Sequence, residues 1–365
     1  MIPRVSFVVP CYKHGHFLLD CVRSILGQSY EDLEIVIMDD CSPDDTPAIA
    51  RALNDRRVRY VRNERNLGHL ANYNKGIGLT RGEFIWLINV DDYLRSPDVL
   101  MRFVAALDAH PTAAYVFCPA VAVRNGVEEA PHGSHGGVDR LISGNAFVAQ
   151  LVARNTVPTP AVMVRRSSYD RVGVFPADMP HAGDWFQWCR HALHGDVAYV
   201  AEPMVCYRRH DANMSTFYLE NPVALVADEM RVRFRVKALA EELGRKEIAR
   251  AALEGIAADY TARVTLGLFE GWRRGLTYEQ FEMSLWEQCL DPHDVSWITA
   301  TVLAGLGDAY YARREREAAR TCYQRALRYT PFAGSSFAKL ALMRAGVAGD
   351  WVRRSRASAS TPATN

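Results

Sequence analysis

Short apolar stretches alternate with amphipathic segments along the first hundred residues. Stretches of four to six mainly apolar or β-branched residues predict strands. These strands are expected at Val5–Val9, Leu33–Met38, Val58–Arg62 and Phe84–Ile88. Between and after them, apolar residues recur at helical spacing. These helices are expected at Phe17–Leu26, Thr46–Asn54, Asn72–Leu79 and Pro97–Ala109, the last capped by Ser96.

Strands that are apolar throughout and are spaced by helices predict a mostly parallel sheet with helices on both faces. In such sheets, ligands bind beyond the carboxyl ends of the strands. Polar side chains follow three of the expected strands, at Pro10–Tyr12, Asp39–Asp40 and Asp91–Asp92. We therefore expect these three segments to converge on one edge of the sheet.

The pattern changes twice further along the chain. Residues 124–142 are rich in Gly and His and predict a mobile loop. A helix at Ser143–Arg154 and strands at Ala161–Arg165, Val197–Ala201 and Met204–Arg208 are expected next. From about Asn221 to Ala345 only helical periodicity remains. We predict an α/β domain over 1–218, an all-α domain over 219–350 and a disordered tail over 351–365.

One segment of the helical part matches a known repeat length. Leu303, Leu306, Gly307 and Tyr310, followed by a second set ending at Pro331, have the spacing of a 34-residue tetratricopeptide unit over about 300–333. A single unit does not stack into a solenoid by itself. We favour a helical extension that stabilises the first domain over a peptide-binding groove.

Composition excludes several classes of protein. The net charge of +1 argues against a dedicated nucleic-acid binder. The eight cysteines are scattered without a CxxC pair, which argues against a zinc site or a disulfide framework. No signal peptide is expected, and Ala113–Val123 is shorter than the about 20 residues that span a bilayer. A cytoplasmic protein is expected; peripheral attachment to the inner face of the membrane through C-terminal arginines, and a homo-oligomer, are left open.

Two adjacent carboxylates, Asp91 and Asp92, end the expected strand at Phe84–Ile88. Like charges this close repel, and each raises the pKa of the other. The pair must therefore be solvated, be neutralised by a basic side chain, or bind a cation. Capping or solvation is the ordinary fate of Asp before a turn.

Five motifs in order over residues 3–215 resemble family-2 glycosyltransferases of the GT-A fold. The first is VSFVVPCYKHGHFLLDCVRSILGQSYEDLEIVIMDDCSPDDT, and the second is RNERNLGHLANYNKGIGLTRGEFIWLINVDDYL. TPAVMVRRSSYDRVGVF, GDWFQW and YRRHDANMS complete the series. The resemblance implies an inverting, metal-dependent transferase that moves a sugar from a nucleotide-diphosphate sugar to a hydroxyl. It does not extend to the C-terminal helices.

The resemblance implies a role for each carboxylate at the end of the fourth strand. Asp92 is expected to bind Mn²⁺ or Mg²⁺, with Asp91 holding the ribose or completing the metal shell. His210 could offer its imidazole to the same metal. Where the family often has a further Asp, this chain has Asn89, so one potential ligand is missing.

The same resemblance assigns the nucleotide site. Tyr12, after Pro10, is expected to lie flat against the base, and Asp39, with Asp40 beside it, to accept the imide N–H of uracil or thymine. A uridine nucleotide is therefore favoured. Four residues around the start of the third helix are expected near the diphosphate or the sugar: Arg65, Asn66, Gly68 and Asn72.

Asp184, in GDWFQW, is expected to be the general base that deprotonates the acceptor. Its aromatic neighbours would desolvate the carboxylate and raise its pKa. His181 could contact the acceptor, which is expected to be a glycan, a lipid-linked sugar or a protein in surface polysaccharide or glycan synthesis.

Two other functions remain open. A nucleotidyltransferase would need a Gly-rich basic loop after the first strand, and PCYKHGHF has one Lys and one Gly. An inactive scaffold that binds partners through the C-terminal helices would not need the carboxylates Asp39, Asp91, Asp92 and Asp184. His14, His16, His132 and His135 are interpreted as ordinary loop residues.

Overall fold

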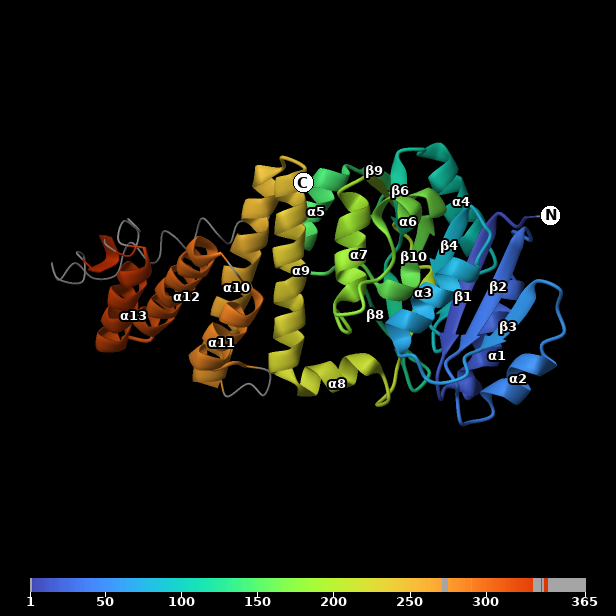
Figure 1. The fold of residues 1–365 in the computed structure, drawn as a ribbon, viewed down its shortest axis with the longest axis horizontal. Helices are drawn as coiled ribbons and strands as arrows, with labels where there is room; N and C mark the ends of the chain where they lie inside the picture. Colours follow the sequence, from blue (N-terminus) through green and yellow to red (C-terminus); the bar gives the residue numbers. More distant parts are fainter. Residues whose placement is uncertain (1, 271–274, 290, 331–335, 337, 341–365) are drawn as a thin grey trace. The chain divides into compact units, whose positions relative to one another are not determined.

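The computed structural model describes residues 2–270, 275–289, 291–330, 336 and 338–340. The first part of the chain alternates strands and helices as the hydrophobic pattern predicts (Figure 1). Its elements are β1 (Val5–Cys11), α1 (Gly15–Leu26), β2 (Leu33–Asp39), α2 (Thr46–Ala52), β3 (Val58–Arg62), α3 (His69–Leu79) and β4 (Phe84–Leu87). Strands and helices thus occur where the sequence predicts them, with the ends displaced by up to three residues.

The four strands are parallel, and their register brings their carboxyl ends together. Val5 of β1 pairs with Leu33 of β2 and with Phe84 of β4. At the other end of the pair, Cys11 of β1 pairs with Asp39 of β2. The segments that follow β1, β2 and β4 therefore share one edge of the sheet, as expected for a ligand site in an α/β fold.

The larger sheet has the strand order β3-β2-β1-β4-β10-β6-β11-β9. β10 runs antiparallel between β4 and β6, and β9 is antiparallel to β11, whereas β11 is parallel to β6. This mixed, mostly parallel sheet confirms the predicted fold class. The remaining elements of this part are β5 (Tyr93–Leu94), α4 (Val99–Ala109), β6 (Ala113–Phe117), β9 (Arg140–Ile142), α5 (Gly144–Leu151), η1 (Thr159–Ala161), β10 (Val162–Arg165), α6 (Arg166–Val172), α7 (Gly183–Ala192) and β11 (Asp196–Tyr199).

A second sheet, in the order β5-β12-β7-β8, corrects the prediction of a loop over 124–142. β7 (Ala120–Arg124) and β8 (Val127–His132) form an antiparallel hairpin, beside which β12 (Val205–Arg209) runs parallel to β7. The turn is Asn125–Gly126, with φ of 52° and 78°. Asn-Gly tolerates this left-handed geometry and favours a two-residue hairpin turn, a signal that the Gly and His content of the segment obscured.

Separate apolar cores cover the two faces of the larger sheet. One contains Leu18 of α1, Ala50 of α2 and Phe103 of α4, and the other contains Tyr73 of α3 and Trp188 of α7. α3 lies so close to the sheet that a Cβ at Gly76 would stand 2.5 Å from Val8 Cγ1 and 2.9 Å from Met38 Cγ. Any larger residue at position 76 would push α3 away from the strands.

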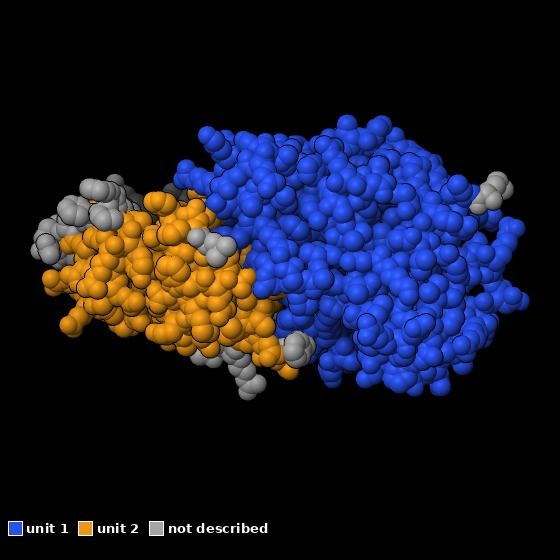
Figure 2. Space-filling model, viewed as in Figure 1, with its two compact units in different colours: residues 1–218, 231–252 blue, residues 219–230, 253–365 orange. Residues whose placement is uncertain are grey.

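The C-terminal part is helical, and its elements are α8 (Met214–Glu220), α9 (Pro222–Glu242), α10 (Lys246–Glu270), α11 (Tyr278–Gln288), α12 (Pro292–Ala312) and α13 (Arg316–Tyr329). The chain divides into two compact units, coloured separately in Figure 2. The first comprises residues 1–218 and 231–252, and the second residues 219–230 and 253–365. Val232, Val236 and Ile248 belong to the apolar core that covers the α3 face of the sheet. The predicted domain boundaries stay a prediction.

In the second unit, α12 and α13 pack against each other where the repeat pattern has its small residues. A Cβ at Gly307 would lie 2.5 Å from Cε1 of Tyr323, and the Tyr323 hydroxyl donates to Asp308 over 2.6 Å. The tetratricopeptide-like unit stays a prediction, since Pro331 lies outside the described residues, as does the predicted tail. None of the described helices is long and apolar enough to cross a membrane.

His191 makes the stability of the first unit sensitive to acid. It is fully buried in α7, where its Nδ1 lies 2.6 Å from the Ser168 hydroxyl and the Gln187 amide donates to its Nε2 over 3.0 Å. Burial, with the nearby charge of Arg190, lowers its pKa to about 3. An unfolded histidine has a pKa of about 6.5. Between these two values the unfolded state binds the extra proton, so stability falls as the pH falls.

Because of His191, we expect the free energy of unfolding to fall by roughly 2 kcal/mol when the pH is lowered from 7.5 to 5. His191→Gln should be less stable than the wild type at pH 7.5 but should lose less on acidification. Urea unfolding at both pH values measures the difference. His110→Gln, at a partly exposed histidine outside the core, should keep the wild-type dependence. A His191→Gln variant with the full wild-type loss would contradict the assignment.

Candidate active site

A cavity of about 450 Å³ lies in the first unit at the carboxyl ends of β1, β2 and β4. The starts of α3 and α7 and the segment after β12 complete its wall. Nine of the predicted site residues line it: Pro10, Tyr12, Asp40, Asn66, Gly68, Asn72, Asp91, His181 and Asp184. Four predicted residues are not part of the lining: Asp39, Arg65, Asp92 and His210. The convergence of the three strand ends is thus observed.

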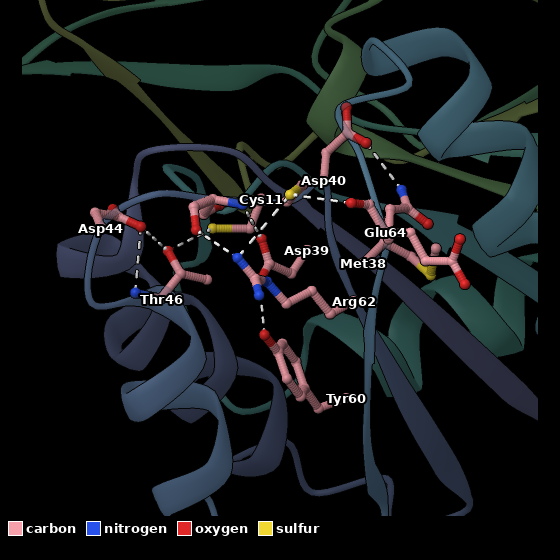
Figure 3. Close-up of polar contacts among 12 residues, drawn as sticks. Cys11, Met38, Asp39, Asp40, Asp44, Thr46, Tyr60, Arg62 and Glu64 are labelled. Carbon is pink, nitrogen blue, oxygen red and sulfur yellow. Dashed lines mark hydrogen bonds and ion pairs between the residues drawn. The ribbon is translucent and has the colours of Figure 1, made fainter.

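Asp39 is fully buried. Its carboxylate is already engaged by polar contacts within the protein (Figure 3). Its Oδ1 accepts the backbone N–H of Ser42 over 2.8 Å, and its Oδ2 accepts the Tyr60 hydroxyl over 2.6 Å. Arg62 Nε lies 3.2 Å from Oδ2. This geometry fixes the turn after β2, and Asp39 is not part of the cavity lining. The predicted contact between Asp39 and a base stays a prediction.

Asp40, by contrast, lines the cavity and holds the loop that precedes α3. Its Oδ1 accepts from the Asn63 side chain and the Leu67 backbone, both over 2.8 Å, and its Oδ2 accepts the Gly68 N–H over 3.0 Å. Gly68 has a φ of 82°, which favours glycine. A carboxylate has about four acceptor positions, so Asp40 retains capacity for a ligand.

The other predicted residues of this loop differ in their placement. Asn72 is buried, donates to the Met38 carbonyl over 2.9 Å and accepts from Asn63 over 2.8 Å, which makes it a support of the cavity floor. Asn66 accepts the Gly68 N–H over 2.9 Å at the rim. Arg65 is exposed and does not reach the cavity.

Asp91 is the cavity-facing carboxylate of the pair that follows β4. Its Oδ2 lies 3.2 Å from His210 Nε2 and accepts from the Asn213 side chain over 3.1 Å. His210 and Asn213 both follow β12, so this strand carries the partners of Asp91 to the end of β4. Asn213 is a site residue that the sequence analysis missed, although it lies within the YRRHDANMS motif.

Asp92 points in a different direction, into the protein. It is 1% exposed, its Oδ1 accepts the Arg208 N–H over 3.0 Å, and its Oδ2 is buried without a hydrogen-bond partner among the described residues. Burial, together with the neighbouring charge of Asp91, raises the pKa of Asp92 well above its ordinary value. Asp91 lies in the turn after β4, and Asp92 directly precedes β5; of the two carboxylates, only that of Asp91 is part of the cavity lining.

His14 is a second residue that the sequence analysis missed, since we interpreted it as an ordinary loop residue. It lines the cavity, and its ring centroid lies 5.2 Å from that of His210. The ring of Phe17 stacks on His210 at the same distance. Burial lowers the pKa of His14, which favours the neutral imidazole. His14 and Phe17, at the start of α1, thus pack against the imidazole of His210, which faces Asp91.

Asp184 lies in the first turn of α7 and lines the cavity. The Thr159 hydroxyl donates to its Oδ2, and the Trp185 N–H donates to its Oδ1 over 2.6 Å. Burial raises the pKa of Asp184 above its ordinary value. Because a base is most effective when its pKa approaches the working pH, this shift suits a proton acceptor. Thr159 opens the motif TPAVMVRRSSYDRVGVF but was not singled out within it.

The described residues contain no group of three or more His, Cys, Asp or Glu side chains arranged to hold a metal ion. Asp91 offers one carboxylate at the cavity wall, and the imidazole of His210 lies 3.2 Å from it, outside the lining. Mg²⁺ and similar cations often take one or two protein ligands and complete their shell with phosphate oxygens and water. The site therefore fits a cation that arrives with a phosphate-bearing ligand and does not fit a metal held by the protein alone.

Residues 6–173 match the family model described as Glycosyl transferase family 2. An uncharacterised protein of Mycobacterium tuberculosis (strain CDC 1551 / Oshkosh) is 30% identical over 240 residues, which cover 63% of this chain and 74% of that protein. Another from the H37Rv strain is 31% identical over 215 residues, 56% of this chain and 59% of that protein. The succinoglycan biosynthesis protein ExoO of Rhizobium meliloti is 40% identical over 108 residues, 30% of this chain and 31% of ExoO.

Among solved structures, residues 1–349 of TarS from S. aureus, in complex with UDP-GlcNAc, superpose with a TM-score of 0.63 at 19% identity. The match covers 87% of this chain and 90% of that chain. At this level of identity the likeness concerns the fold alone.

Proposed function

The chain belongs to glycosyl transferase family 2, and on that premise we propose that it transfers a sugar from a UDP-sugar to an acceptor hydroxyl with inversion. The observation that carries the proposal is the single cavity that brings Tyr12, Asp40, Asp91 and Asp184 together from four separate segments. The first three suit a nucleotide diphosphate, and the fourth suits an acceptor.

The nucleotide is proposed to lie between Tyr12 and Asp40. Tyr12 is 38% exposed, and its ring can stack on a planar base. Asp40 is proposed in place of Asp39, because Asp40 lines the cavity and Asp39 does not. A carboxylate that accepts a ring N–H suits uracil or thymine better than cytosine or adenine, which have no such N–H on the pairing edge. The UDP-GlcNAc complex of the structurally similar TarS supports the same preference.

The diphosphate is proposed to lie against Asp91 and His210, which would hold Mn²⁺ or Mg²⁺ together with phosphate oxygens. The sequence predicts Asp92 as the direct ligand; we assign this role to Asp91 instead, because the Asp92 carboxylate is buried and does not line the cavity. When bound, such a cation stabilises the negative charge that develops on a departing diphosphate. Asn213 keeps Asp91 oriented through its hydrogen bond to Oδ2.

Asp184 is proposed to remove the proton of the acceptor hydroxyl. The oxygen of this hydroxyl attacks the anomeric carbon while the bond from that carbon to the diphosphate oxygen breaks, and the proton passes to the carboxylate. A single displacement inverts the anomeric centre and needs one base, in contrast to the paired carboxylates of retaining mechanisms. Thr159 holds the carboxylate in place until the acceptor arrives.

The biological setting is proposed to be the synthesis of a surface polysaccharide or glycan, with a glycan, lipid-linked or protein acceptor. The naming of the relative ExoO as a succinoglycan biosynthesis protein supports this setting. Since the alignment covers about a third of ExoO, we infer neither the sugar nor the linkage made by this chain from that relative. A cytoplasmic location, peripheral membrane attachment and self-association stay predictions.

A thermal-shift panel of UDP, dTDP, GDP and ADP, each with and without Mn²⁺, tests the proposal. UDP with Mn²⁺ should raise the unfolding temperature most, and removal of the cation with a chelator should abolish most of the rise. Tyr12→Ala should reduce the shift, whereas Arg65→Ala should leave it unchanged because Arg65 does not reach the cavity. If none of the nucleotides stabilises the protein with either Mn²⁺ or Mg²⁺, the proposed function is wrong.

A further inference from the structure

A second cavity, of about 390 Å³, adjoins the first in the same compact unit. It lies between the end of β8, the segment from Arg154 to Pro160 that follows α5, and Tyr207 of β12. Thr159 and Tyr207 line both cavities. Its volume falls within the range of about 300–1,000 Å³ typical of small-ligand pockets.

We infer that this second cavity binds the acceptor, and that Arg154 selects an acceptor sugar unit that carries a carboxylate or phosphate group. The inference rests on the proposed function, and it assigns the acceptor class that the sequence could not supply.

The position of Thr159 connects the second cavity to the proposed base. Its hydroxyl donates to Asp184 Oδ2, and the residue forms part of the boundary between the cavities. A sugar held in the second cavity could present a hydroxyl at this boundary and replace Thr159 as the donor to Asp184. The cavity that holds Asp184 also holds Asp40 and Asp91, which are proposed to bind the nucleotide sugar. The sugar donor and the acceptor hydroxyl would therefore meet at Asp184.

The lining of the second cavity suits a carbohydrate. The rings of His132 and Tyr207 lie edge to face with centroids 6.0 Å apart, and Val157 and Pro158 add apolar surface for the C–H face of a sugar. The imidazole of His132 adds ring nitrogens that can bind sugar hydroxyls. Asn155 adds an amide group that can bind sugar hydroxyls.

At Gly133, the wall of the second cavity is tightly packed against the segment that follows α5. It has a φ of 79°, and a Cβ there would lie 2.7 Å from Pro158 Cδ and 2.8 Å from the Thr156 carbonyl oxygen. Only glycine allows the end of β8 to approach the segment after α5 so closely. The hairpin, which the sequence analysis took for a mobile loop, therefore forms one side of the cavity.

The charge of the second cavity is positive. Arg154 is exposed at its edge, and no carboxylate pairs with it in the part of the chain that the structure describes. None of the described residues that line this cavity is acidic. A guanidinium binds carboxylate or phosphate through two parallel hydrogen bonds, which gives both charge and geometric selectivity. An acidic sugar unit thus fits the site better than a neutral one.

Two matched probes test the inference: methyl β-D-glucuronide and methyl β-D-glucoside, which differ only in the carboxylate. Each is titrated by NMR into the full chain with saturating UDP and Mg²⁺. The glucuronide should bind more tightly than the glucoside. Arg154→Ala should weaken glucuronide binding by at least about tenfold, because the charge-assisted hydrogen bonds of the guanidinium are lost. The same variant should leave glucoside binding unchanged. Arg56→Ala, at an exposed arginine outside both cavities, is the control and should change neither.

Glucose 6-phosphate is the third probe, and it distinguishes selection of a phosphate group from selection of a carboxylate. Binding that exceeds that of the glucuronide and depends on Arg154 would identify phosphate as the selected group, whereas weaker binding would identify carboxylate. Equal affinity of the glucuronide and the glucoside, or an Arg154→Ala variant that binds all three probes as the wild type does, would overturn the inference. If UDP binds but the saccharides do not, the acceptor assignment fails and the proposed function stands; if UDP itself does not bind, both fail.

Discussion

Asp184→Asn should lower the rate of sugar transfer by about 10²–10⁴-fold, the usual contribution of a positioned base. Asparagine keeps the shape of the side chain and can still accept a hydrogen bond through its carbonyl oxygen, so the start of α7 should not change. It cannot take a proton from the acceptor. UDP binding should therefore be retained while turnover is lost, and transfer assays combined with calorimetric titration of UDP measure the two effects separately.

The pH dependence supplies an independent test of the same residue. Since burial raises the pKa of Asp184, transfer should decline on the acid side of the profile above the ordinary aspartate pKa of about 3.9. The decline occurs as the pH falls, because protonation removes the base. Asp170→Asn, at an exposed carboxylate of α6, is the control and should retain wild-type activity. Full activity in the Asp184→Asn variant would exclude the proposed base.

Asp91→Asn should abolish most of the cation-dependent part of UDP binding. Asp91 is the carboxylate that faces the cavity and pairs with His210, so its loss removes the anionic ligand of the proposed metal site. We expect at least a tenfold loss of UDP affinity in Mn²⁺ and a much smaller change in chelator, since a hydrogen bond or ion pair to a charged group contributes about 1.5–3 kcal/mol. Calorimetric titration of UDP with Mn²⁺ and with EDTA measures both values.

Asp92→Asn is the matched comparison at the adjacent position. The side chain is buried, and asparagine can still accept the Arg208 N–H, so most of the cation dependence should remain. The sequence alone led to the opposite expectation, that Asp92 is the residue whose loss weakens metal-dependent binding most. If Asp92→Asn loses the cation effect and Asp91→Asn retains it, the expectation from the sequence is right and the assignment from the geometry is wrong.

The sequence predicted the parallel half of the sheet well because that half depends on local pattern. β1, β2, β3 and β4 are short apolar or alternating runs, and the helices between them repeat at a clear helical period. The hairpin of β7 and β8 was missed, although Asn125–Gly126 is a strong turn signal, because β8 is exposed throughout and has no apolar period.

The candidate site was predictable to the level of segments. The carboxyl ends of parallel strands meet at one edge, so the strand pattern alone predicts that Tyr12, Asp40 and Asp91 lie together. Asp184 followed from the resemblance of its motif. Thr159, His14 and Asn213 were not singled out, because each acts through a neighbour that carries the chemistry: Asp184, His210 and Asp91 respectively.

The sequence by itself thus determined the α/β fold, the family resemblance and the edge of the sheet where the site lies. Only the tertiary structure decided which carboxylate of each adjacent pair faces the cavity. Asp39 and Asp40, like Asp91 and Asp92, are chemically identical neighbours, so only the contacts that each carboxylate makes in the folded chain distinguish them. Hydrogen bonds from Tyr60 and Ser42 hold Asp39 outside the cavity lining, and the Arg208 N–H holds Asp92 in the interior. Tyr60 and Arg208 come from other strands, so no local pattern in the sequence could reveal these contacts.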